Sequence, residues 1–115
     1  MISETGFMEK GELRKVAKIR NRGTIIVITN KVIFKYEKER NDIEIPFEEI
    51  SNIILKNWLN LKIHLKNGDI YTLSCSIDEI AGNIGLFSPN PVKLLRRKNT
   101  ALYHTLKALL EEYKK

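Results

Sequence analysis

Residues 23–36 read Gly-Thr-Ile-Ile-Val-Ile-Thr-Asn-Lys-Val-Ile-Phe-Lys-Tyr. Eight of these fourteen residues are β-branched. Such side chains favour extended backbone because their χ1 rotation is restricted and because they pack well on a pleated surface. Asn30-Lys31 interrupts the apolar run where a tight turn is expected, since asparagine tolerates left-handed backbone angles. The pattern predicts a β-hairpin at the centre of the fold.

The segment before this hairpin, residues 11–20, alternates weakly between apolar and polar side chains. Leu13, Ala17 and Ile19 share one face at a period of two, with Val16 out of step, which a β-bulge would explain. We therefore expect a strand here, followed by a turn at residues 21–23, where Asn-Arg-Gly carries typical turn residues.

Downstream of the hairpin, residues 37–42 are too polar for a core and predict an exposed loop. Residues 43–45 alternate as a short strand, and Pro46 marks a strand end or a sheet edge because proline lacks the amide hydrogen. Residues 47–50 follow, and the spacing of Ile50 and Ile53 predicts one helix-like turn, after which residues 53–56 predict another short strand. Residues 57–60 form a connection that carries the only tryptophan, Trp58.

A second hairpin follows, with one apolar set on each strand. The inward positions are Leu61, Ile63 and Leu65, then Tyr71, Leu73 and Cys75. A two-residue Asn-Gly turn would bury polar residues of the returning strand. If Leu65 instead faces Asp69, then Ile63 pairs with Tyr71, and Gly68 occupies a left-handed bulge after a type I turn. We predict this bulged register.

The last part of the chain predicts helix. Residues 76–79 match a capping box at the start of a short helix, and Pro91 suits a first helical position with Asn90 as its cap. Beyond it, one stripe repeats with alternating spacings of three and four. Its members are Val92, Leu95, Asn99, Leu102, Leu106, Leu109 and Tyr113. One long helix and a helix broken near residues 98–100 both fit, and both contain residues 100–114.

This order of elements predicts a mainly β fold with a C-terminal helix: seven antiparallel strands, at about residues 11–75, closed by an amphipathic helix. It resembles the pleckstrin-homology superfold, most closely its GRAM-like and bacterial branch. Four stretches carry the resemblance, and they are residues 11–15, 26–34, 45–50 and 61–68. The resemblance implies a single domain over residues 1–115, built as a partly open barrel or sandwich, that serves as an interaction module.

Composition indicates a globular chain of 115 residues with a formal net charge of +6 and one cysteine. No apolar run is long enough to span a membrane, and the first ten residues do not resemble a secretory signal. We expect a cytoplasmic protein, with the inner membrane face as the place where a peripheral form would act. Basic residues gather at 10–22 and 93–98, whereas residues 35–49 are mildly acidic, so one surface could meet an anionic partner.

Residues able to carry catalysis are few. His64 and His104 have no carboxylate at a metal-ligand spacing, and Cys75 occupies an inward strand position. Glu48 and Glu49 are adjacent and would point apart on a strand, so they suit acid–base catalysis poorly. We expect no enzyme activity, no metal and no cofactor.

One basic cluster matches a binding pattern. In inositol phosphate-binding domains of the family that the chain resembles, basic residues around the first hairpin bind the phosphates in a loose Lys…Lys/Arg-x-Arg pattern. Lys15, Lys18 and Arg20 match it, and Arg22 shares a strand face with the latter two. Two helix residues, Arg96 and Arg97, could add to this anion- or lipid-binding site.

Three functions follow from these features. The first is a non-catalytic interaction module that binds a protein or itself, since open sheet edges can accept an added strand. The alternative is peripheral binding to an anionic membrane lipid or to phosphate groups through the basic cluster. Nucleic-acid binding ranks last because the basic segments lack interleaved aromatic residues for base stacking.

Overall fold

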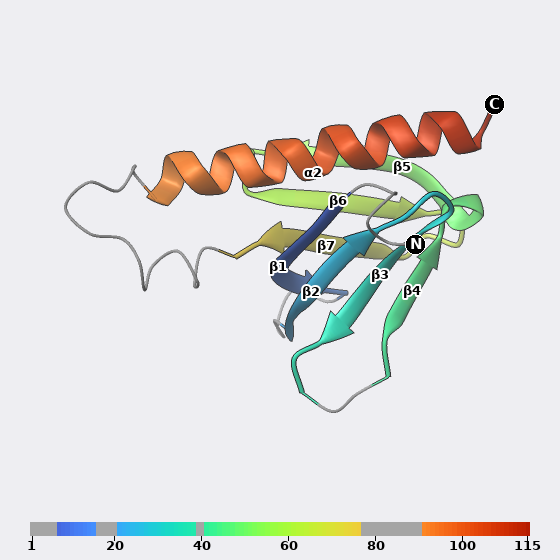
Figure 1. Ribbon diagram of the computed structural model, residues 1–115. Coiled ribbons are helices and arrows are strands. Elements are labelled where there is room, and N and C mark those ends of the chain that lie inside the picture. The colour runs from blue at the N-terminus through green and yellow to red at the C-terminus, as the bar shows by residue number, and fades with distance from the viewer. Residues whose placement is uncertain (1–6, 16–20, 39–40, 77–90) are drawn as a thin grey trace.

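Figure 1 shows the computed structural model, which describes residues 7–15, 21–38, 41–76 and 91–115. Its elements in chain order are β1 (Phe7–Arg14), β2 (Asn21–Val27), β3 (Lys31–Tyr36), β4 (Ile43–Pro46), the 3₁₀-helix η2 (Phe47–Glu49), β5 (Ile50–Lys56), β6 (Asn60–Leu65), β7 (Ile70–Cys75) and α2 (Pro91–Tyr113). The prediction of a mainly β fold with a C-terminal helix is confirmed.

The seven strands form one antiparallel sheet in the order β4-β3-β2-β1-β7-β6-β5. β1 therefore pairs with both β2 and β7, so that the sheet curls into a half-barrel whose two edges are β4 and β5. The strands β1 to β4 run at a steep angle to β5, β6 and β7, and α2 lies along the latter group (Figure 1). The predicted edge position of Pro46 is confirmed.

The core fills the concave side of the sheet and the face of α2 that covers it. The strand residues most deeply buried in it include Leu13, Ile25, Phe34, Phe47, Leu61, Ile63 and Leu73. The helix contributes Leu102, Leu106 and Leu110. The predicted stripe packs on its own domain through its middle members, but Leu110 is buried more deeply than the predicted Leu109, and Val92 is exposed. None of the helices in the described part of the chain has the length and apolar content needed to cross a bilayer.

Two predictions about the start of the sheet are wrong. β1 begins at Phe7, four residues before the expected strand, and residues 21–23 lie in β2 and not in a turn. Gly23 allows the backbones of β2 and β3 to approach closely, because a Cβ at this position would lie 2.0 Å from the backbone oxygen of Lys35. The bulge expected around Val16, and the positions of Ala17 and Ile19, lie outside the described residues.

The turn of the first hairpin is displaced by one residue from its predicted position. Val27 pairs with Val32, and the Ile28 amide donates a hydrogen bond to the Lys31 carbonyl at 3.0 Å, so Thr29 and Asn30 form the turn. Among the described non-glycine residues, the positive φ angles belong to Asn57 and Trp58, so the left-handed conformation expected of Asn30 is also wrong.

The second hairpin has the predicted register. Ile63 pairs with Tyr71, and the Leu65 amide donates a hydrogen bond to the Asp69 carbonyl at 2.8 Å. Gly68 has a φ of 96°, which only glycine adopts without strain, and its amide donates to the Leu65 carbonyl at 3.0 Å. The alternation of apolar and polar side chains was sufficient to select this register.

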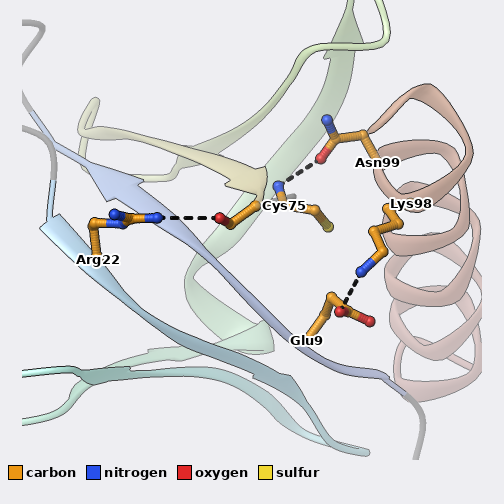
Figure 2. Close-up of polar contacts among 6 residues, drawn as sticks. Glu9, Arg22, Cys75, Lys98 and Asn99 are labelled. Atoms are coloured by element: carbon orange, nitrogen blue, oxygen red, sulfur yellow. Dashed lines mark hydrogen bonds and ion pairs between the residues drawn. The ribbon is translucent and has the colours of Figure 1, made fainter. Parts of the chain in front are cut away.

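α2 is one continuous helix that begins at Pro91, as expected for proline at a first helical position. The alternative with a break near residues 98–100 is excluded. Asn99 does not cap a second helix, because its side chain is fully buried and its Oδ1 accepts a hydrogen bond from the Cys75 amide at 2.8 Å (Figure 2). The expected capping box at residues 76–79 and the Asn90 cap lie partly or wholly outside the described residues.

Candidate functional site

A row of outward-facing side chains crosses three neighbouring strands. Arg14 of β1 pairs with Thr72 of β7, and Thr72 pairs with Lys62 of β6. The preceding residue in β1, Leu13, pairs with Leu73, and both are buried in the core. Since successive side chains point to opposite faces of a strand, the row lies on the convex face of the sheet.

This row forms part of an open groove of about 380 Å³. The groove is lined by Arg14, Lys15, Lys56, Asn57, Leu59, Asn60, Lys62, Ile70 and Thr72. Four of these nine described residues are cationic at neutral pH and none of the nine is acidic. We call this surface the basic groove. Amide and hydroxyl groups between the cations can donate further hydrogen bonds to an anion.

Hydrogen bonds within the domain position two of the cations. The Arg14 guanidinium donates to the side-chain oxygen of Asn60, an uncharged partner, at 3.3 Å. Lys15 lies 3.2 Å from the Asp69 carboxylate, at the mouth of the bulged hairpin. The hydrogen bond to Asp69 raises the pKa of Lys15, and charge interactions with Tyr71 and Asp69 add to this effect. The Lys15 nitrogen also lies 5.6 Å from the centre of the Tyr71 ring.

The turn between β5 and β6 contributes Asn57 and Leu59 to the lining of the basic groove. Asn57 and Trp58 both have a φ of 53°, and the Leu59 amide donates to the Lys56 carbonyl at 3.2 Å. The Leu59 carbonyl accepts hydrogen bonds from the Ser74 hydroxyl at 2.8 Å and from the Asn99 side chain at 3.1 Å. The turn is therefore tied to both β7 and α2.

Arg96 extends from the first half of α2 to this same turn. Its guanidinium carbon lies 4.7 Å from the centre of the Trp58 ring. A guanidinium over an indole face is held by electrostatic attraction to the ring and by stacking. This contact brings a fifth cation to the end of the basic groove.

The predicted site residues are only partly brought together. Lys15 lines the basic groove and Arg96 lies at its end, whereas Arg97 is exposed on α2 without lining it. Arg22 lies on β2, where its guanidinium donates to the Ser76 hydroxyl at 3.4 Å, outside the set of groove residues (Figure 2). Lys18 and Arg20 lie outside the described residues.

Sequence reasoning missed Arg14, Lys56 and Lys62. The signal was present, because Arg14 and Lys62 each follow a buried residue on their strands and Lys56 follows the half-buried Leu55, so all three occupy outward positions. The three residues lie on different strands, however, and only the pairings of β1 with β7, of β7 with β6 and of β6 with β5 bring them to one surface.

Cys75 and the Lys98–Glu9 ion pair contribute to the structure of the domain and lie outside the basic groove. Cys75 is buried, and burial raises the pKa of its thiol to about 12, so the reactive thiolate is disfavoured. Lys98 of α2 lies 2.5 Å from the Glu9 carboxylate and joins the helix to β1 (Figure 2). Among the described residues, His, Cys, Asp and Glu side chains form no group of three that could hold a metal ion.

A second hollow of about 230 Å³ lies between β5 and α2. Its lining includes Lys107 and Lys114 but also Glu111, so its charge is mixed. Of the two hollows described, the basic groove has the more distinct chemistry.

Comparisons with known proteins give a fold and no function. No family model matches the chain, and no curated protein matches it. One solved structure similar to it is the C-terminal domain of an unknown protein from Leishmania infantum. That domain has a TM-score of 0.54 and 13% sequence identity, with 67% of this chain and 75% of that chain covered. At this identity the likeness supports the fold alone.

Proposed function

We propose that the chain is a non-catalytic module that binds phosphate-bearing anions through the basic groove. The observation that carries this proposal is the lining of the groove, which holds Arg14, Lys15, Lys56 and Lys62 and no acidic residue. Four cations around one hollow raise the local positive potential, and a low-dielectric sheet on one side focuses it.

The arrangement suits an anion with several phosphate groups. Arg14 and Lys62 flank Thr72 on adjacent strands, so their Cα atoms lie about 10 Å apart across the sheet. The arginine can bind phosphate oxygens in a bidentate fork, whereas the lysines act as point charges. The Thr72 hydroxyl and the Asn57 side chain lie in the same lining and can complete the hydrogen bonding.

The proposal develops the second of the functions that the sequence suggests. Protein binding or self-association through a sheet edge stays a prediction. The described edges offer it less support, because β4 has four residues and ends in Pro46, while α2 packs beside β5. Membership of the pleckstrin-homology superfold, on its GRAM-like branch, likewise stays a proposal that rests on the element order and the four resembling stretches.

Isothermal titration with inositol hexakisphosphate tests the proposal. The variant Lys56→Glu/Lys62→Glu reverses two charges of the groove and should weaken binding at least about tenfold, since each close charge contributes about 1 kcal/mol. The control Lys35→Glu/Lys38→Glu makes the same charge change at two exposed residues, one within β3 and one after it. Wild-type affinity in the groove variant, or equal losses in both variants, would refute a site in the groove.

A further inference from the structure

The turn between β5 and β6 holds a bulky aromatic residue in a backbone conformation that disfavours it. Trp58 has a φ of 53°, directly after Asn57 with the same angle. Glycine and asparagine occupy this region readily, whereas a large side chain there is uncommon and strained. A small residue at position 58 would therefore fit the fold at least as well. We interpret the presence of tryptophan there as evidence of a role at the surface.

Trp58 is also the most conspicuous member of an exposed apolar group beside the basic groove. The Trp58 side chain is 43% exposed. The exposed fractions of Ile54, Leu59 and Ile70 are 43%, 38% and 37%. Leu59 and Ile70 line the groove, and Ile54 pairs with Lys62 on the convex face of the sheet. Cations and apolar side chains thus share one surface.

The contact with Arg96 adds a further cation at the tip of this surface. With the guanidinium 4.7 Å from the ring centre, the indole is held in place while part of it stays open to solvent. Tryptophan and arginine together suit the boundary between water and lipid, where the indole lies at the level of the headgroups and the guanidinium meets their phosphates.

We propose that the occupant of this surface is an anionic bilayer, with Trp58 and Leu59 entering its interfacial layer while the basic groove binds lipid phosphates. This inference rests on the proposed function and names the source of the phosphate groups. Charge complementarity supports it, because anionic lipids attract clustered Lys and Arg, and insertion of apolar side chains adds affinity that a soluble phosphate compound cannot supply.

The single tryptophan of the chain is a built-in reporter for the test. Wild-type protein is titrated with vesicles of phosphatidylcholine alone and with vesicles of phosphatidylcholine mixed with phosphatidylserine. We expect the Trp58 emission to move to shorter wavelength with the anionic vesicles only. Vesicles that also contain phosphatidylcholine brominated on its acyl chains should quench the emission, because quenching requires contact with the lipid.

Two variants test the role of the turn by vesicle sedimentation. Trp58→Asn places a residue that tolerates positive φ at the tip, so it should fold normally, which circular dichroism checks. Its binding to anionic vesicles should fall about tenfold, as expected for the loss of a partly inserted apolar side chain. The control Met8→Asn removes a side chain that is 61% exposed at the other end of β1, and it should bind like the wild type.

The outcomes separate this inference from the function on which it rests. Binding of inositol hexakisphosphate without binding to anionic vesicles would assign the groove to a free phosphate compound and overturn the membrane proposal alone. Vesicle binding without quenching, or with Trp58→Asn equal to the wild type, would overturn insertion of the turn. Absence of binding to both probes would overturn the proposed function as well.

Discussion

Asn99 in the middle of α2 accepts a hydrogen bond from the Cys75 backbone amide at the end of β7, at 2.8 Å from its Oδ1. The same side chain donates to the Leu59 carbonyl at 3.1 Å. One buried amide thus joins the helix, the last strand and the turn that lines part of the basic groove, so the position of that turn depends on a helix residue far away in the sequence.

Replacing this amide should destabilise the domain. In Asn99→Ala the Cys75 amide loses its acceptor in a buried place, whereas the Leu59 carbonyl keeps its hydrogen bond from Ser74. The expected loss is about 1–3 kcal/mol in the free energy of unfolding, the cost of one unsatisfied buried group. Urea denaturation measures it, with exposed Asn52→Ala as the control. Equal midpoints for the two variants would contradict a structural role of Asn99.

Gly23 should tolerate no larger side chain. A Cβ there would lie 2.0 Å from the Lys35 carbonyl oxygen, which belongs to the neighbouring strand backbone and has little freedom to move. Gly23→Ala should therefore cost about 1–3 kcal/mol of stability, as overpacking does in cores. Thermal unfolding followed by circular dichroism checks this, and an unchanged melting temperature would show that β2 and β3 lie further apart than described.

Cys75 should make the stability of the domain fall at alkaline pH. Burial raises its pKa from 9.0 to about 12, so above pH 9.0 the unfolded chain releases a proton that the folded chain retains. The stabilisation that this pKa difference gives the folded state is fully present below pH 9.0 and is lost as the pH rises towards about 12. Wild type should lose stability more steeply over this window than Cys75→Ala, by up to about 1.4 kcal/mol per pH unit. If the unfolding free energies of the two proteins, measured by urea denaturation, fall equally with pH, the raised pKa of the thiol is contradicted.

Asp69 should weaken anion binding in the groove by neutralising Lys15, which lies 3.2 Å away. The substitution Asp69→Asn keeps the backbone hydrogen bond that closes the second hairpin and removes the negative charge. We expect the affinity for inositol hexakisphosphate to rise by about two- to fivefold, a gain typical of one exposed charge. Titration at low and high salt checks the origin of the effect, because screening should reduce the gain. A lower affinity in the variant would argue against Lys15 as a ligand.

The sequence was most informative where one pattern determined one structure. Alternation of apolar side chains selected the register of the second hairpin and placed Gly68 in its left-handed bulge, and Pro91 marked the start of α2. The same reasoning misplaced Gly23, because a glycine needed for close approach of two strands looks like a turn residue when its neighbours in space are unknown.

The candidate site was harder to predict than the fold. The local basic pattern singled out Lys15, but its groove partners come from β5 and β6, and no local pattern links Arg14 to Lys62. Asn99 illustrates the same limit, since its place in an apolar stripe indicates a buried polar contact without naming Cys75 or Leu59. Contacts between distant segments depend on strand order, which a single sequence determines only loosely.

The most direct test of the central claim is to locate the bound anion by nuclear magnetic resonance. Amide signals of isotope-labelled wild-type protein are followed during titration with inositol hexakisphosphate. The largest shifts should fall on the groove residues, from Arg14 and Lys15, through the segment between Lys56 and Lys62, to Thr72. Shifts centred on Arg22 and its neighbours in β2, or no saturable shifts at all, would contradict an anion site in the basic groove.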